Sequence, residues 1–267
     1  MPSQDHPGHI NVAIAPNTSG RHIRQAMVLA AGLGERMRPL TDTTPKPMLP
    51  IAERPIIDRI IDDLERGGIE RVVVNTFYLP DAIEDHLSKR ATPEIVFSRE
   101  ETRLETGGGI LNALDYFDGK PFFVINGDTL WLDGPTPTLD RLETLWDAGR
   151  MDALLLLHET VDAYGYDGRG DFTVTPEGLL ARRPEMEITP YVFTGTQIVQ
   201  PAMFDSVKSR KGEAFSMNIL FDHAIAEGRL HGIIHDGEWF HIGTPDGLEE
   251  VEEFMRDPFP GVEHRST

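Results

Sequence analysis

A glycine-rich segment near the N-terminus, residues 29–41, carries the residues best suited to bind a phosphate. Its glycines, Gly32 and Gly34, let the backbone close on an anion and present N–H groups to it. Three cations follow in the sequence: Arg36, Arg38 and Lys46. Arginine offers phosphate a planar fork of donors, and lysine a compact charge. The segment predicts an anion-binding loop, with solvated cations on a strand-to-helix turn as the alternative.

Two common phosphate-binding motifs do not describe this loop. A dinucleotide fingerprint needs a further glycine where Met37 stands. A P-loop needs Gly-Lys followed by serine or threonine, which the segment lacks. The loop therefore belongs to neither class.

A carboxylate follows another predicted strand, in the sequence Asn126-Gly127-Asp128. The carboxyl edge of a parallel sheet is where α/β proteins bind ligands, and a carboxylate there can hold Mg2+ alongside substrate phosphates. An ordinary turn with Asp128 as a cap is the alternative.

A second glycine run, residues 104–109, precedes a predicted helix at residues 110–117. Its glycines allow close backbone approach, and the free N–H groups of a helix N-terminus could face a base or a phosphate. A flexible loop without a ligand is the alternative. Asn75 ends another predicted strand, where asparagine also forms turns.

The apolar pattern predicts the elements that position these residues. Short apolar runs predict buried strands at residues 26–30, 72–74, 95–97, 122–125 and 153–157. Helical periodicity predicts helices at residues 56–64, 82–87, 110–117, 139–148, 219–226 and 245–255. This alternation is typical of an α/β fold with a Rossmann-like, mostly parallel sheet between helices. From about Gly165, short pieces such as 171–175 and 191–193 predict a small β-rich substrate lobe.

Composition limits the classes of function. The 267 residues carry a net charge of −19, which disfavours binding to nucleic acid or to an anionic membrane. The absence of cysteine excludes disulfides, a thiolate nucleophile and cysteine-bound metals. No apolar run is long enough to span a membrane, and the first 24 residues lack the apolar core of a signal peptide. We therefore expect a cytoplasmic protein.

Three motifs together resemble the signature of the sugar-1-phosphate nucleotidylyltransferases, or NDP-sugar pyrophosphorylases. They are Gly-Leu-Gly-Glu-Arg at 32–36, Pro-Leu-Thr at 39–41 and Pro-Lys-Pro at 45–47. The resemblance covers roughly residues 25–250 and implies the nucleotide-diphospho-sugar transferase fold. It implies Mg2+-dependent transfer of a nucleotidyl group from an NTP to a sugar-1-phosphate, with release of pyrophosphate.

The resemblance also implies roles for individual residues. Arg36 would hold the triphosphate, Lys46 would contact the phosphates in the transition state, and Asp128 would bind the metal. The two glycine runs and Asn75 would contact the nucleotide, through Leu29, Ala30, Ala31, Gly32, Gly34, Asn75, Thr106, Gly107 and Gly108.

The chain departs from the family pattern at two places. The segment Trp239 to Pro245 resembles a motif in which an aspartate is often the second metal ligand, but His241 stands there. Imidazole suits Mn2+ better than Mg2+. Asp128 could hold the ion with waters and phosphates, His241 could ligate it, or another residue such as Asn218 could take the role. Structural hydrogen bonding is the alternative for His241. On the sugar side, Thr194 and Gly195 match the family, whereas Arg183 stands where a Glu-Lys-Pro lysine is common.

We expect an N-terminal extension at 1–24, one nucleotidylyltransferase domain at 25–256 and a tail at 257–267, as a monomer or homodimer. Residues 10–14 could form an edge strand. Within the family the chain looks most like the small N-acetylmuramate-1-phosphate uridylyltransferases of cell-wall recycling. The alternatives are a mannose-1-phosphate guanylyltransferase using GTP and a non-catalytic nucleotide-sugar-binding regulatory protein.

Overall fold

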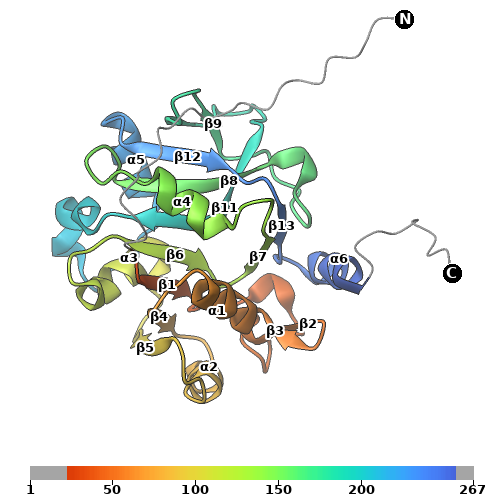
Figure 1. Ribbon diagram of the computed structural model, residues 1–267. Helices are drawn as coiled ribbons and strands as arrows, with labels where there is room; N and C mark the ends of the chain where they lie inside the picture. Colours follow the sequence, from red (N-terminus) through yellow and green to blue (C-terminus); the bar gives the residue numbers. More distant parts are fainter. Residues whose placement is uncertain (1–22, 257–267) are drawn as a thin grey trace, which may run out of the picture.

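The structure is a computed structural model that describes residues 23–256 (Figure 1). The possible edge strand at residues 10–14 and the expected tail at 257–267 lie outside the described residues.

A nine-stranded mixed sheet forms the centre of the protein. Its strands run in the order β10-β9-β11-β6-β1-β4-β5, and β8 joins β11 to β12. The pairs β1–β4, β1–β6, β4–β5 and β8–β12 are parallel, whereas β11 is antiparallel to both β6 and β8. The strands span β1 Gln25–Leu29, β4 Arg71–Thr76, β5 Glu94–Arg99, β6 Phe122–Asn126, β8 Ala153–Glu159, β9 Phe172–Val174, β10 Leu180–Arg182, β11 Tyr191–Val199 and β12 Leu230–Ile234.

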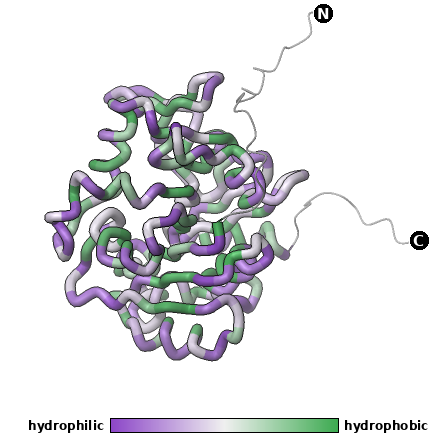
Figure 2. Tube along the Cα trace, turned by 60° about the vertical axis from the view of Figure 1, so that its left-hand side comes forward, coloured by the Kyte–Doolittle hydropathy of each residue, from purple (hydrophilic) through white to green (hydrophobic). Residues whose placement is uncertain are grey.

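Both faces of this sheet are buried, as the continuous apolar runs predict. Along β1, Ala26 and Val28 pack into one hydrophobic cluster and Met27 into the other. The same alternation runs through β4 and β6, because successive side chains of a strand point to opposite faces. In Figure 2 the hydrophobic stretches run through the interior strands, and hydrophilic stretches lie mainly at turns.

Helices cover the two faces of the sheet. Buried side chains of α1 (Ile56–Arg66), α2 (Pro80–Leu87) and α4 (Thr138–Leu145) belong to the first cluster. Those of α3 (Glu105–Ala113) and α5 (Asn218–Ala226) belong to the second. The predicted fold class is therefore confirmed.

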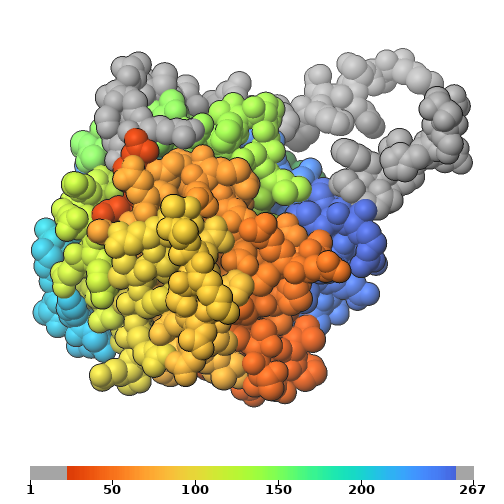
Figure 3. All heavy atoms as spheres, turned by 60° about the horizontal axis from the view of Figure 1, so that its bottom comes forward, coloured from red at the N-terminus to blue at the C-terminus, as the bar shows by residue number. Residues whose placement is uncertain are grey.

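Two short sheets and the last helix complete the fold. Strands β7 (Thr129–Leu132) and β13 (Glu238–His241) pair antiparallel, and so do β2 (Pro50–Ile51) and β3 (Arg54–Pro55). Helix α6 (Pro245–Arg256) lies beside the β2–β3 region, where Ala52 N donates to Glu252 Oε1 at 2.8 Å. Figure 3 shows this region in orange next to the blue C-terminal part. Within residues 23–256 no helix is long and apolar enough to cross a membrane.

The predicted boundaries of two helices are wrong, and one of them is α4, which ends at Leu145 rather than at residue 148. Helix α3 begins at Glu105 rather than at residue 110, so the glycine run lies inside its first turns. A side chain at Gly107 would meet the Phe215 ring at 2.5 Å, and one at Gly109 would meet Glu100 Oε1 at 2.8 Å. Glycine is needed at these positions because α3 packs closely against its neighbours. The periodicity of apolar residues does not reveal this packing.

Candidate active site

A cavity of about 200 Å3 lies at the carboxyl ends of β1, β4 and β6. The central parallel strands all end at this edge of the sheet, where ligands bind in α/β folds. The structure brings segments distant in sequence together here, with a lining of Leu29, Ala31, Gly32, Lys46, Pro47, Asn75, Arg103, Glu105, Thr106, Asn126, Gly127 and Asp128. Most of the residues predicted to bind the nucleotide therefore share one cavity.

The wall of this cavity holds an ion pair between Lys46 and Asp128. Lys46 Nζ donates to Asp128 Oδ2 at 2.8 Å, and Lys46 is only 8% exposed. Burial opposes the charge on Asp128, but Lys46, and with it His241 and Arg36, outweighs this and lowers the pKa of the carboxyl. Asp128 is therefore an anion at neutral pH, held beside a largely buried cation.

His241 reaches the same place from the other end of the chain. Strand β13 pairs with β7 so that His241 lies opposite Thr129, next to Asp128, and Ile242 N donates to Asp128 O at 3.1 Å. The imidazole stacks on Trp239 at 5.9 Å between ring centroids. Burial lowers the pKa of His241, against the pull of the Asp128 charge. The neutral ring keeps a nitrogen lone pair, as a metal ligand must.

The first glycine loop folds back onto the segment that carries Lys46. Gly34 has a left-handed backbone with φ of 64°, and a side chain there would meet Thr41 Cγ2 at 2.9 Å. The Thr41 hydroxyl donates to Gly34 O at 2.8 Å. A side chain at Gly32, by contrast, would meet no heavy atom within 4 Å, so the loop is open on its cavity side.

The two arginines of the loop differ in the charged groups with which they interact. Arg38 is exposed and pairs with Asp42 at 3.5 Å. Arg36 is also exposed, and its charge acts on both Asp128 and His241. Arg36 is thus the loop arginine whose charge acts on the carboxylate.

The second glycine run contributes differently from the prediction. The N–H groups of Gly107 and Gly108 both donate to Phe215 O, at 2.9 and 3.1 Å. The expectation that these N–H groups face a base or a phosphate is therefore wrong. Thr106 does line the cavity, and its Oγ1 accepts from Met217 N at 2.9 Å.

The residues predicted for the sugar side are engaged with the protein itself. Arg183 donates from Nε to Gly170 O at 3.0 Å and from Nη1 to Glu187 O at 3.1 Å. Thr194 is fully buried, and its hydroxyl donates to Leu156 O. Gly195 has φ of 86° and packs against the Asn126 side chain. The sequence indicates these residue types, but it does not reveal that their side chains are hydrogen-bonded to backbone carbonyls of the protein.

The alternative metal ligand Asn218 is occupied elsewhere. Asn218 begins α5, and its Oδ1 accepts from Arg182 Nη2 at 3.0 Å. Arg182 also pairs with Asp222. The structure thus brings His241 to Asp128 and engages Asn218 with an arginine.

Sequence reasoning missed several residues at the cavity. Arg103, Glu105 and Asn126 line it, and Glu105 adopts a left-handed backbone with φ of 59°. Glu100 is 5% exposed and accepts hydrogen bonds from two cavity segments. Glu105 lies in the second glycine run and Asn126 in the Asn-Gly-Asp sequence, but neither motif singles out these side chains, and no periodic or motif signal marks Arg103 or Glu100.

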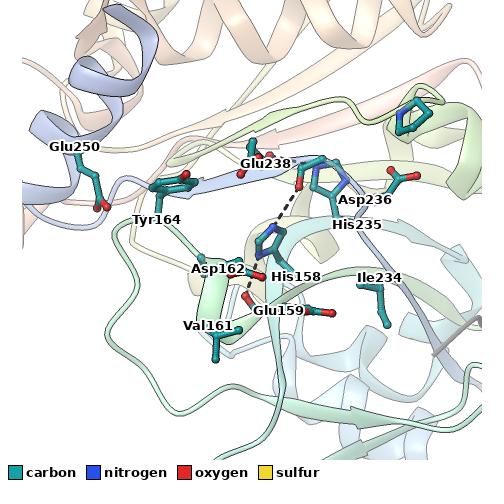
Figure 4. A pocket seen from close by; sticks show the side chains of 13 residues that line it. His158, Glu159, Val161, Asp162, Tyr164, Ile234, His235, Asp236, Glu238 and Glu250 are labelled. Carbon is teal, nitrogen blue, oxygen red and sulfur yellow. Dashed lines mark hydrogen bonds between the residues drawn. The ribbon is translucent and has the colours of Figure 1, made fainter. Parts of the chain in front are cut away.

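A larger cavity of about 950 Å3 lies beside the ends of β8 and β12 (Figure 4). Five carboxylates line it, namely Glu159, Asp162, Asp236, Glu238 and Glu250, and no lysine or arginine within residues 23–256 does. Such a surface repels a triphosphate. The smaller cavity with Lys46 is therefore the candidate nucleotide site.

His235, in the wall of this larger cavity, gives the protein a specific acid sensitivity. Burial, with a contribution from His158, lowers the pKa of His235 to about 4. In the unfolded chain, where nothing buries the ring, the pKa of His235 returns to its ordinary value of 6.5. Below that pH the unfolded state takes up a proton that the folded state refuses, so stability falls as the pH falls.

We expect His235 to contribute about 2 kcal/mol of the stability lost between about pH 7 and about pH 5. Urea unfolding of wild type and His235→Gln at both pH values measures it. Glutamine retains an N–H donor for Leu132 O and Glu238 O, the partners of His235 Nε2. An equal loss of stability in both proteins would contradict the assignment.

Two known enzymes of the same name are similar to this chain over most of its length. The chain is 38% identical over 232 residues to the N-acetylmuramate alpha-1-phosphate uridylyltransferase of Caulobacter vibrioides, which covers 85% of this chain and 95% of that protein. It is 35% identical to the enzyme of the same name from Neisseria meningitidis, over 85% and 96% of the two chains.

Solved structures share the fold. A UDP-glucose pyrophosphorylase in complex with UDP-glucose matches with a TM-score of 0.74 and 20% identity, over 89% of this chain and 100% of that one. HddC from Yersinia pseudotuberculosis in complex with GMP-PN matches with a TM-score of 0.70 and 25% identity, over 87% and 100%. The nucleotidyl transferase family matches residues 25–257. The resemblance inferred from the loop motifs is confirmed, and this chain is an enzyme of the nucleotidyl transferase family.

Proposed function

We propose that this enzyme transfers a uridylyl group from UTP to a sugar-1-phosphate, with N-acetylmuramate-1-phosphate as the preferred acceptor, in cell-wall recycling in the cytoplasm. The observation that carries the proposal is the Lys46–Asp128 pair in a cavity at the carboxyl ends of the parallel strands. The names of the two relatives at 35–38% identity support the choice of substrates. Residues 25–256 are proposed to form one catalytic domain.

The reaction needs no protein nucleophile. An oxygen of the sugar phosphate forms a bond to the α-phosphorus of UTP while the bond from that phosphorus to the bridging oxygen breaks, and pyrophosphate leaves. Because the attacking group is already an anion, the protein's task is to hold two anions in line and offset the developing charge. We assign this task to Lys46 and Arg36, with the glycine loop around the phosphates.

The residues present fit a divalent ion that takes most of its ligands from outside the protein. In the part of the chain that the structure describes, no group of three His, Asp or Glu could hold a metal alone. Asp128, with the neutral imidazole of His241 beside it, matches Mg2+ or Mn2+ bound through few side chains together with waters and phosphates. When bound, the ion offsets charge on the phosphates. The protein's own part is to present the Asp128 carboxylate beside Lys46.

The remaining binding roles belong to the same proposal. Leu29, Ala31, Gly32, Asn75 and Thr106 line the cavity and are proposed to contact the nucleotide. Arg183 and Gly195 are proposed for the sugar-phosphate side, with Arg183 acting through its charge while two of its nitrogens hold backbone carbonyls.

A screen of pyrophosphate release tests the substrates. The four common ribonucleoside triphosphates are combined with N-acetylmuramate-1-phosphate, N-acetylglucosamine-1-phosphate, glucose-1-phosphate and mannose-1-phosphate, with and without Mg2+. We expect the highest kcat/KM for UTP with N-acetylmuramate-1-phosphate. Without a divalent ion we expect no release of pyrophosphate. A preference for GTP with mannose-1-phosphate would support a guanylyltransferase instead, and nucleotide binding without any release would support a regulatory protein.

A further inference from the structure

We propose that Glu100 is a positioning residue that joins the two walls of the nucleotide cavity. One wall is the start of the first glycine loop at Ala30, and the other is the turn at Leu104 that leads into α3. Glu100 does not line the cavity, so it acts through these two segments rather than by touching the nucleotide. The inference rests on the proposed function, because it concerns binding of the same NTP.

A continuous chain of hydrogen bonds connects the walls. Ala30 N donates to Asn75 Oδ1 at 2.8 Å, and Asn75 Nδ2 donates to Glu100 Oε1 at 2.7 Å. The other carboxylate oxygen, Glu100 Oε2, accepts from Leu104 N at 3.0 Å. Two of these hydrogen bonds join residues distant in sequence, and the third fixes a turn. Together they hold the carboxyl ends of β1, β4 and β5 in one arrangement.

Glu100 is placed in a way that costs stability. The residue is 5% exposed and burial raises the pKa of its carboxyl, against its hydrogen bonds to Asn75 and Leu104. No arginine or lysine pairs with it among the described residues. A buried carboxylate held only by neutral donors costs more free energy than a neutral polar group at the same place.

The surrounding packing is also adapted to this carboxylate. A side chain at Gly109 would meet Glu100 Oε1 at 2.8 Å and Asn75 Nδ2 at 2.9 Å. The turn that Glu100 fixes continues into Glu105, whose left-handed backbone lines the cavity. Strained backbone at a binding site persists only where the surroundings hold it.

The donor and acceptor directions of these hydrogen bonds allow a specific test. Both neighbours of Glu100 are donors, so a carboxylate satisfies both. In Glu100→Gln one side-chain oxygen must serve two donors, and the amide NH2 faces a donor. Adding Asn75→Asp reverses one link: Gln Nε2 then donates to the aspartate, which still accepts from Ala30 N, while Gln Oε1 accepts from Leu104 N. Every link is satisfied again.

The experiment measures KM for UTP, KM for the sugar-1-phosphate, kcat and thermal stability in four proteins: wild type, both single variants and the double variant. We expect Glu100→Gln to raise KM for UTP about tenfold, as one unpaired buried donor implies. KM for the sugar phosphate should change less than about twofold. The double variant should recover the thermal stability, and KM for UTP only in part, because Asn75→Asp also adds a carboxylate to the cavity wall. Glu101→Gln, an exposed carboxylate next in the sequence, is the matched control and should behave as wild type.

Several results would overturn the proposal. They are an unchanged KM for UTP in Glu100→Gln, an equal rise in KM for both substrates, or a double variant no better than Glu100→Gln. If neither Glu100→Gln nor the double variant folds, Glu100 is required for the fold and the positioning role is wrong. If wild type itself shows no turnover with any pair of substrates, the proposed function fails instead, which keeps the two failures distinct.

Discussion

Replacing Lys46 with methionine is expected to lower kcat by about 10²–10³-fold, the effect of removing one preorganised charge from a transition state. Lys46 is 8% exposed and its Nζ lies 2.8 Å from Asp128 Oδ2, so its position is fixed before substrate arrives. A fixed charge needs no reorganisation during the reaction, and a partly buried one is poorly screened by water. Methionine keeps the length and apolar stem of the side chain, so the loss is one of charge.

The effect of Lys46→Met should appear in kcat more than in KM. Lys46 is assigned to charge that develops at the α-phosphate, whereas the ground-state triphosphate is also held by the glycine loop and Arg36. Steady-state pyrophosphate release at saturating UTP measures this. Lys120→Met removes an exposed lysine and is the control. If Lys46→Met retains more than about a tenth of wild-type kcat while remaining folded, the assignment of Lys46 is wrong.

The sequence predicts strands β1, β4, β5, β6 and β8 of the central sheet well because each of them carries its own apolar run. Val72, Val73 and Val74 form one apolar run, and such runs occur where a strand is covered on both faces. The same holds for residues 122–125, and it places Asp128 at the sheet edge where the structure has it. Asp128 and Lys46 could be chosen from the sequence because their types and motif positions are specific.

Contacts between distant segments do not follow from the local sequence pattern, and only the family resemblance suggested that His241 lies near Asp128. The pairing of β7 with β13 brings His241 to Asp128, and neither short strand has a pattern of its own. The carbonyl of Phe215 takes the N–H groups of Gly107 and Gly108, so glycines that read as a ligand loop are packing positions. Glu100 reads as one acidic residue among several, and only its burial and two donors distinguish it. Such features depend on tertiary partners rather than on local sequence.

Replacing Asp128 with asparagine is expected to lower kcat by about 10³-fold or more while leaving the fold intact. Asparagine has the same shape, and its Oδ1 can still accept from Lys46 Nζ, so the local hydrogen bond survives. What the variant loses is the negative charge that a divalent ion requires beside the phosphates. Thermal unfolding should change little, and Asp115→Asn, at an exposed residue paired with Lys211, serves as the control.

The two roles available to Asp128 predict different effects of Asp128→Asn on the metal dependence of UTP binding. A carboxylate in the wall of a triphosphate site repels the nucleotide unless a cation lies between them. Asp128→Asn should therefore bind UTP more tightly than wild type when metal is chelated, and gain less affinity than wild type when Mg2+ is added. A structural aspartate that only holds Lys46 would leave the metal dependence of UTP binding unchanged. Calorimetric titration of UTP into both proteins, with EDTA and with Mg2+, distinguishes a metal-binding carboxylate from a structural one independently of turnover.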